Sequence, residues 1–452
     1  MNTLKEKVVG SWYGMAVGDA MGLAVRGLKP ETVRQLFGAM DGFKDVRPFL
    51  GKGIKRFSMQ GLYGIQTQSA LVIADCLLKN KSGRVKKDIL ELWVRLSAGG
   101  PEHYLGVYRR PESGFSKAIG SLMESSSARV AEHDRSDASF SAMGIPVGLI
   151  YRDRTEEAIG LSVEIGLLMS RNLCEVTGVA LAGYLAGRLL LLDPGEGDSP
   201  LTENDAERVL FDAEELCRKA EARFGEAASE LWEQTADPER GMLEYTLRGL
   251  RENWSLGFDD LVSWICQNAS GLLKTKITNP AQGHVLTLIP LALVLALREG
   301  IGFDSALTRG LSMGKEADKT GVLVGAWAGA LYGWSRIPQT WRSGLVNGKE
   351  IRLRGESLFS GRLPRNVKDL YEMELGLTAK EYEMGKKFFP RPASKFTRPT
   401  PRPALSWEDD TGDETALPEK SDVAGWRKFQ KDKSKMKRDR RKHLKQGNDD
   451  YE

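Results

Sequence analysis

Two runs of glycine at a spacing of four residues constrain this chain more than any other feature. The first run comprises Gly10, Gly14, Gly18 and Gly22, and the second comprises Gly321, Gly325, Gly329 and Gly333. Residues four apart share one face of an α-helix, and each interior glycine costs about 1 kcal/mol of helix stability relative to alanine. A chain tolerates that loss where backbones must approach each other or a ligand closely. The runs predict two closely packed helices with acidic residues beside them, namely Asp19, Glu316 and Asp318.

Helical periodicity recurs between these two glycine ladders, and period-2 alternation is almost absent, which predicts an all-α fold. Predicted helices cover residues 3–26, 61–80, 86–98, 114–125, 155–170, 172–192, 203–235, 242–251, 258–270, 283–299, 303–313 and 320–335. Residues 30–60 are expected to form a loop or a short helix, and residues 340–384 have less pattern. We predict one helical domain over residues 1–384 and a disordered tail over residues 385–452, Pro-rich at first and then charged.

The net charge of +4 is divided unevenly between these two parts. From residue 385 onward there are eighteen Lys and Arg against twelve Asp and Glu, so the tail carries +6 and the body about −2. Residues 426–446 alone hold eleven basic and two acidic residues. Such a segment is suited to an anionic partner, although a solvated tail is the simpler interpretation. The near-neutral body does not indicate a dedicated nucleic-acid-binding domain.

The cysteines and the apolar stretches indicate a cytoplasmic, intracellular protein. Cys76, Cys174, Cys217 and Cys266 are scattered without metal-ligand spacing, and each is expected to be a buried thiol in a reducing compartment. The N-terminal residues lack the apolar run of a signal peptide. The most apolar stretch, residues 285–297, contains Pro290 and is shorter than the roughly 20 residues that a membrane span requires.

Five segments, taken in order, resemble the ADP-ribosylglycohydrolase family over roughly residues 8–345. Residues 18–22 read Gly-Asp-Ala-Met-Gly, 67–71 read Thr-Gln-Ser-Ala-Leu, and Ala-Met at 142–143 precedes Pro-Val-Gly-Leu at 146–149. Gly-His-Val at 283–285 precedes Leu-Ala-Leu at 291–293. The second glycine ladder, within 325–333, is followed by Ile337-Pro338 and Trp341. The resemblance implies an orthogonal α-helical bundle that holds two magnesium ions in a central cleft. It also implies cleavage of the bond between ADP-ribose and a protein or another acceptor.

The two metal-binding motifs of that family are altered in this chain. Where the family has Thr-Asp-Asp-Thr, residues 64–67 read Gly-Ile-Gln-Thr, so two carboxylates are missing. Where the family has Gly-Asp-x-Asp-Thr, residues 315–319 read Lys-Glu-Ala-Asp-Lys. Arg26 stands where many members have a glutamate. Mg²⁺ prefers hard oxygen ligands and usually needs carboxylate charge, so magnesium binding here is in question.

The resemblance nevertheless implies a degenerate site that can be assigned residue by residue, although no catalytic residue can be named. The candidate metal ligands are Gln66, Glu316 and Asp318, and the candidate substrate-binding residues are Asp19, Ser139, Ser141, Met143 and Lys319. The Lys319 ammonium group is expected to stand where a metal would, paired with Glu316, Asp318 or Asp19. Such a pair supplies no activated water.

Structural interpretations of the same residues remain open. Asp19 is also suited to helix packing or capping. Glu316 and Asp318 would stabilise the N-terminus of any helix through its dipole. Lys319 also suits an ordinary surface position, and Ser139 and Ser141 also suit an ordinary loop. Trp327 and Tyr332 are expected in the core. Three functions follow: a protein that binds ADP-ribose or a related ribosyl nucleotide with impaired hydrolysis, an active glycohydrolase with altered metal dependence, or a scaffold whose basic tail binds an anionic partner.

Overall fold

The structure of this chain, a computed structural model, describes residues 3–79, 84–102, 104–124, 135–194, 201–235, 239–299 and 302–388. These residues form helices and connecting loops, and no β-strand occurs among them. The all-α prediction is therefore confirmed. The predicted tail lies almost entirely outside the described residues, so its boundary at 384, its disorder and its anionic partner stay predictions.

The first half of the described chain is a succession of helices, with a longer irregular stretch at residues 50–64. Its helices are α1 (Leu4–Gly22), α2 (Pro30–Phe37), η1 (Arg47–Phe49), α3 (Ile65–Lys79), α4 (Val85–Ser97), α5 (Ser113–Glu124), η2 (Ser141–Met143), α6 (Gly144–Ile150), α7 (Thr155–Met169), α8 (Leu173–Leu189) and α9 (Glu203–Ala227). The predicted helix 3–26 is shorter than expected, because the chain turns after Gly22. The predicted helix 203–235 is broken at Ala228 into α9 and the short α10 (Ser229–Gln234).

The second half continues in the same way and contains three helices that sequence periodicity did not predict. Its helices are α11 (Met242–Glu252), α12 (Phe258–Leu273), α13 (Val285–Val294), the π-helical η4 (Leu295–Glu299), α14 (Phe303–Ser312), α15 (Ala317–Tyr332), η5 (Trp334–Arg336), α16 (Gln339–Gly344), α17 (Gly348–Ser360) and α18 (Leu370–Lys386). Helices α16, α17 and α18 occupy the stretch in which little pattern was found. None of the described helices combines the length and apolarity that a bilayer crossing requires.

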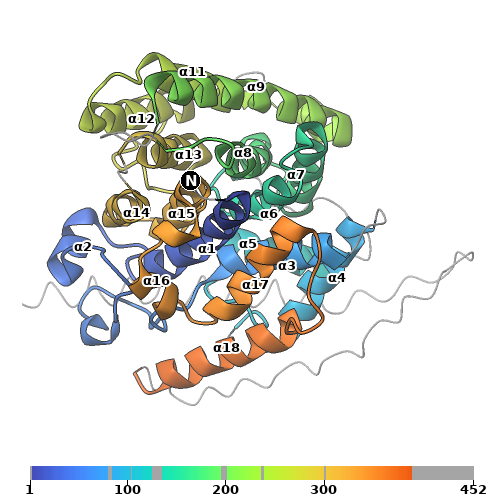
Figure 1. Cartoon of the computed structure of the whole chain (residues 1–452), viewed down its shortest axis with the longest axis vertical. Coiled ribbons are helices and arrows are strands. Elements are labelled where there is room, and N and C mark those ends of the chain that lie inside the picture. Colours follow the sequence, from blue (N-terminus) through green and yellow to red (C-terminus); the bar gives the residue numbers. More distant parts are fainter. Residues whose placement is uncertain are drawn as a thin grey trace, which may run out of the picture. The chain divides into compact units, whose positions relative to one another are not determined.

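Helices α1 and α15 run through the middle of the helical domain, with α9, α11 and α12 at one end and α18 at the other (Figure 1). Every residue of α15 is buried, as is every residue of α1 from Lys7 onward. A helix that is covered on all sides must be apolar nearly all round. Both helices are apolar apart from a few polar residues, which makes each buried charge on them a feature that needs an explanation.

The two glycine ladders interlock rung by rung, as the sequence predicted. A Cβ atom added to Gly18 would lie 1.9 Å from the carbonyl oxygen of Gly321, and one added to Gly14 would lie 2.2 Å from that of Gly325. One added to Gly10 would lie 2.5 Å from the Gly329 oxygen. Any side chain on these faces would force the helices apart. The lost helix propensity is thus offset by backbone-to-backbone packing over the whole crossing.

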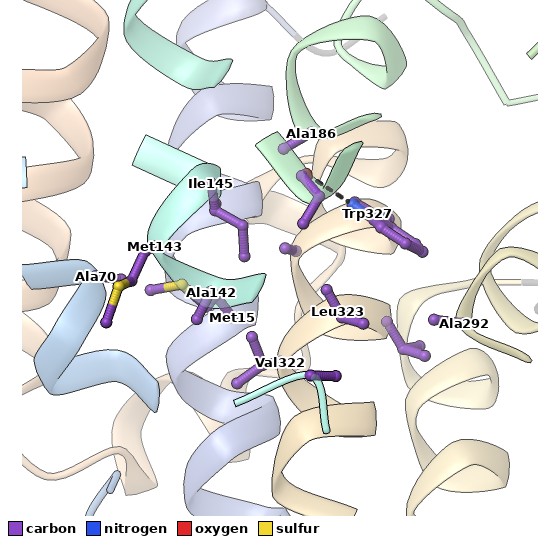
Figure 2. Close-up of a cluster of buried hydrophobic side chains, with 14 of the residues drawn as sticks. Met15, Ala70, Ala142, Met143, Ile145, Ala186, Ala292, Val322, Leu323 and Trp327 are labelled. Atoms are coloured by element: carbon purple, nitrogen blue, oxygen red, sulfur yellow. Dashed lines mark hydrogen bonds between the residues drawn. The ribbon is translucent and has the colours of Figure 1, made fainter. Parts of the chain in front are cut away.

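The core beside this crossing is close-packed and aliphatic. The indole Nε1 of Trp327 on α15 donates to the carbonyl of Ala182 at 3.2 Å, and Figure 2 shows Leu323 one turn away from Trp327. Trp327 is fully buried and Tyr332 nearly so, which confirms that both are core residues. The four cysteines are also buried free thiols, as predicted.

Candidate functional site

The crossing of α1 and α15 brings two acidic residues to the same end of the helix pair. Asp19 follows Gly18 on α1, and Asp318 lies in the first turn of α15. Gly22 packs directly on the backbone of Asp318, where an added Cβ would come within 2.5 Å of its Cα. Both carboxylates are fully buried. The ladders thus place two charges where the hydrophobic core would otherwise continue.

Asp19 binds the N-terminus of α3 through one of its two oxygens. Its Oδ2 accepts hydrogen bonds from the backbone N–H of Gly64 at 3.0 Å, the backbone N–H of Thr67 at 2.8 Å and the Thr67 hydroxyl at 2.7 Å. Its Oδ1 is buried and accepts none. Burial, together with the nearby charge of Asp318, raises the pKa of Asp19 to about 6 even though these hydrogen bonds lower it.

The turn after α1 brings a cation to these acids. The N–H of Gly27, whose φ of 82° suits glycine, donates to the carbonyl of Lys315 at 2.7 Å, and the N–H of Lys315 donates to the carbonyl of Leu28 at 2.8 Å. These bonds hold the turn against the segment that precedes α15. Arg26 lies in this turn, and its guanidinium Nη1 comes within 3.2 Å of Asp318 Oδ2.

Four side chains of alternating charge form a closed ring at this point, which we call the charge ring. Arg26 Nη2 lies 2.9 Å from Glu112 Oε1, and Glu112 Oε2 lies 2.9 Å from Lys319 Nζ. Lys319 Nζ lies 3.6 Å from Glu316 Oε2, and that oxygen lies 3.7 Å from Arg26 Nε. Each cation therefore contacts both acids of the ring, and each acid contacts both cations.

The ring faces solvent on one side and covers buried carboxylate oxygens on the other. The Glu316, Arg26 and Glu112 side chains are 28%, 19% and 12% exposed, whereas Asp318 is fully buried. Neither oxygen of Asp318 accepts a hydrogen bond, and neither does Oε2 of Glu316. Buried polar atoms are nearly always hydrogen-bonded in proteins, so this concentration of unsatisfied acceptors is unusual.

Lys319 joins the ring to a neighbouring loop. Its ammonium group donates to the carbonyl of Asp137 at 2.6 Å and to the Ser139 hydroxyl at 3.3 Å, and Ser139 Oγ in turn donates to Glu112 Oε2 at 2.6 Å. Burial alone would lower the pKa of Lys319, but the charge of Glu112 and the other nearby acids outweighs it, and the pKa is raised. The lysine is therefore a permanent cation.

The loop that carries Ser139 is held from behind by a carboxylate on α8. Glu175 accepts the backbone N–H of Ala138 at 2.7 Å and that of Phe140 at 2.9 Å. Ala138 has a φ of 57°, a conformation that a non-glycine residue adopts only under constraint. Burial, followed by the charge of Asp137, raises the pKa of Glu175 to about 8.

The structure brings together most of the residues that the sequence assigned to a site. Ser139, Glu316, Asp318 and Lys319 belong to the charge ring or contact it, as described above, and Asp19 lies at the same end of the α1–α15 crossing as Asp318. The roles assigned to them stay predictions. Lys319 pairs with Glu316, one of its three expected partners, and its second carboxylate partner, Glu112, was not expected.

The remaining candidates lie deeper. Met143 is fully buried, and Figure 2 shows it beside Ala70 and Met15 among apolar side chains. Ser141 is buried and its Oγ has no hydrogen-bond partner, and the same holds for Nε2 of Gln66. None of these three contacts the charge ring through a hydrogen bond or ion pair.

Two members of the charge ring were not assigned to the site from the sequence. Glu112 lies just before α5, in a segment without periodicity or a motif. Arg26 was noted only as a departure from a glutamate. Its signal was available, since a basic residue close after an acidic glycine ladder is unusual, but its reach into the acids depends on the turn at Gly27.

The residues at this site do not fit a pair of divalent cations. Gly64 and Ile65 offer no side-chain oxygen, and an added Cβ at Gly64 would lie only 2.9 Å from the Leu23 side chain. Of the acids that remain, Glu112, Glu316 and Asp318 are already contacted by Arg26 or Lys319. In the described part of the chain, no group of three or more His, Cys, Asp or Glu side chains is arranged to hold a metal ion.

Comparison with known proteins gives two positive findings. A family model described as ADP-ribosylglycohydrolase matches residues 1–368. A solved structure titled "ADP-ribosylglycohydrolase-related protein complex" superposes with a TM-score of 0.53 at 18% identity, over 79% of this chain and 98% of that one. At that identity the likeness shows a shared fold and nothing further. No curated protein matched the chain significantly.

Proposed function

Because the chain belongs to the ADP-ribosylglycohydrolase family, we propose that it binds ADP-ribose or a related ribosyl nucleotide without metal-dependent hydrolysis. The observation that carries this proposal is the chemistry of residues 64–66 and of the acids next to them. Positions 65 and 66 hold isoleucine and glutamine, and the acids nearby are neutralised by side-chain cations rather than left free for a metal.

The support for ligand binding comes from polar groups that the protein itself leaves unsatisfied. Asp19 Oδ1 and both oxygens of Asp318 accept no hydrogen bond, although Arg26 lies 3.2 Å from Asp318 Oδ2 as its ion-pair partner. The hydroxyl groups of a ribose are donors of the kind these carboxylates lack. Arg26 and Lys319, beside them, carry the charge that a diphosphate needs. Since Asp19 and Asp318 are fully buried, access to them requires that the partly exposed Arg26 move aside.

The support for impaired hydrolysis is that the acids of the charge ring are paired with side-chain cations and present no vacant group of carboxylates, within the described residues, for a metal that would activate water. A metal-bound water is a potent nucleophile because the cation lowers the pKa of that water. A lysine or an arginine held between carboxylates does not provide this. The ring residues of this chain can bind and orient an anionic ligand, exclude water from Asp318 and keep their own protons.

The test is calorimetry of the full chain with ADP-ribose, once with Mg²⁺ and once with EDTA, combined with an assay for ADP-ribose release from a modified protein. We expect binding of equal affinity in both conditions and no release above background. Arg26→Gln should weaken binding at least about tenfold, because it removes one charge-assisted contact to phosphate. Arg154→Gln, at an exposed ion pair, is the control.

Three outcomes would overturn the proposal in different ways. Binding that requires Mg²⁺, with release of ADP-ribose, would identify an active glycohydrolase of altered metal dependence. Equal weakening by Arg26→Gln and Arg154→Gln would place the ligand away from the charge ring. No binding in either condition would favour the scaffold hypothesis.

A further inference from the structure

We infer that Arg26 and Lys319 are built-in counter-ions that make this acidic centre independent of divalent cations. The inference concerns the stability and metal response of the centre. It is tested without a nucleotide, so it can fail or succeed separately from the proposed function.

The first argument is the geometry of the ring. The two cations and two acids alternate, with two contacts of 2.9 Å on the Glu112 side and contacts of 3.6 and 3.7 Å on the Glu316 side. A ring of this kind has no net charge, and opposite charges are nearest neighbours throughout. It balances the charges of Glu112 and Glu316 without any other ion.

The second argument is that both cations are positioned by backbone as well as by charge. Arg26 Nη1 donates to the carbonyl of Arg110 at 3.3 Å, and the turn that carries Arg26 is hydrogen-bonded to Lys315. Lys319 lies in the first turn of α15 and donates to the Asp137 carbonyl at 2.6 Å. A lysine or arginine side chain on the surface would not be held by such hydrogen bonds to backbone carbonyls. These two side chains are held in the centre by the fold itself.

The third argument is the negative charge of the two acids outside the ring, Asp318 and Asp19. Asp318 contacts the ring only through Arg26, and Asp19 contacts no cation at hydrogen-bond distance. If both cations were removed, four acids (Asp19, Glu112, Glu316 and Asp318) would share one buried region without compensation. Carboxylates crowded in this way attract hard divalent cations such as Mg²⁺. With the two cations in place, no group of three or more acids in the described chain is arranged to hold a metal ion. Once the cations are removed, the acids are free to rearrange around one.

The experiment compares thermal unfolding of the full chain with that of Arg26→Gln/Lys319→Thr in EDTA, in about 10 mM MgCl₂, and in NaCl of equal ionic strength. We expect the wild-type unfolding temperature to be the same in MgCl₂ and in the matched NaCl. We expect the double variant to unfold at least about 5 °C lower in EDTA and to regain about half of that loss with MgCl₂ but not with NaCl.

The matched control is Arg154→Gln/Lys219→Thr, which removes the same charges from exposed ion pairs with Glu157 and Glu156. It should shift the unfolding temperature by less than about 1 °C and show no response to Mg²⁺. If the double variant does not fold, Lys319→Thr alone keeps Arg26 and is expected to show the same Mg²⁺ response at a smaller amplitude.

Two results would overturn the inference. One is a wild-type chain that Mg²⁺ stabilises beyond the NaCl control, with the effect lost in Asp318→Asn, since the acids would then bind a metal despite the ring. The other is a double or single variant whose lost stability no divalent cation restores, since the two side chains would then act by packing rather than as counter-ions.

Discussion

Two buried charge clusters in this molecule differ in how completely their polar atoms are hydrogen-bonded. In the cluster around Arg354, which joins α17 to α3, every guanidinium nitrogen has a partner. Nε donates to Asp75 Oδ1 at 2.8 Å, Nη1 to Glu350 Oε2 at 3.1 Å, and Nη2 to the Lys368 carbonyl at 2.9 Å. Around Asp19 and Asp318, by contrast, buried carboxylate oxygens have no hydrogen-bond donor in the described protein.

The difference separates a structural role from a functional one. Stable proteins satisfy their buried polar groups, and the exceptions concentrate at sites that act on something else. A complete set of hydrogen bonds around Arg354 fixes two helices and leaves nothing to bind. The incomplete set of hydrogen bonds at the end of the α1–α15 crossing is the part of the molecule that our proposal assigns to a ligand. Three substitutions test this contrast.

The largest effect is expected from Arg354→Met. This change leaves Asp75 and Glu350 buried without their cation, and breaking a buried pair in this way costs about 3–5 kcal/mol of unfolding free energy. Urea denaturation measures the loss. The control is Arg352→Met, two residues before Arg354, which removes an exposed ion pair with Glu356. It should cost less than about 1 kcal/mol of unfolding free energy. Equal losses in the two variants would mean that the Arg354 cluster contributes little, and the comparison would fail.

The second effect is a change in the pH dependence of stability in Asp19→Asn. Burial raises the pKa of Asp19 in the folded state to about 6, from the 3.8 that is ordinary for an aspartate. The proton on Asp19 therefore stabilises the folded state below pH 4, and this contribution is lost as the pH rises through 6. A shift of this size corresponds to about 3 kcal/mol. Asparagine keeps the acceptor for Gly64 and Thr67 but does not titrate.

Urea denaturation at pH 4, 5, 6 and 7 measures this contribution as the difference between wild type and Asp19→Asn. Relative to wild type, the variant should gain stability steadily from pH 4 to pH 7. A difference that stays constant across this range would show that Asp19 is not titrating, and that its buried oxygen is stabilised by something absent from the hydrogen bonds described above.

How far the sequence predicted these features depends on whether the signal is local. The α1–α15 crossing was predictable because a spacing of four residues places all four glycines on one face of a helix. That face has no Cβ atoms, and the spacing is visible in the sequence. A second crossing of the same kind, between α6 and α8, was not predicted. There Gly148 and Gly183 meet so closely that an added Cβ on Gly148 would lie 1.7 Å from the Gly183 oxygen. Each helix contributes too few regularly spaced glycines to form a ladder.

The charge ring was only half predictable for a similar reason. Lys319, Glu316 and Asp318 lie within one motif, so their proximity follows from the chain. Glu112 reaches the ring because the segment before it is fixed from a distance: Arg109 pairs with Glu374 of α18 at 2.7 Å. That contact joins parts of the chain far apart in sequence, and α18 lies in the stretch with little periodic pattern. No pattern in the sequence near Arg109 or Glu112 predicts this ion pair.

The smallest effect, and the one most specific to the contrast, is expected from Asp318→Asn. Removing this charge relieves its repulsion with Asp19 but also ends its 3.2 Å ion pair with Arg26, which stays paired with Glu112 and Glu316. It also removes an acid from the first turn of α15, which costs some tenths of a kcal/mol. Because Arg26 keeps two other carboxylate partners, we expect the relieved repulsion to nearly offset both losses, and the free energy of unfolding to change by less than about 1 kcal/mol.

Asp75→Asn is the matched change in the Arg354 cluster, where the carboxylate accepts from Nε at 2.8 Å and from Nη2 at 3.3 Å. It should cost about 2–3 kcal/mol, because a satisfied charge-assisted pair is lost with no repulsion relieved. Urea denaturation of both variants at pH 7 tests this difference between the two clusters. A loss in Asp318→Asn as large as that in Asp75→Asn would mean that Asp318 serves the fold rather than a ligand, because a residue reserved for binding can lose its charge without weakening the protein that holds it.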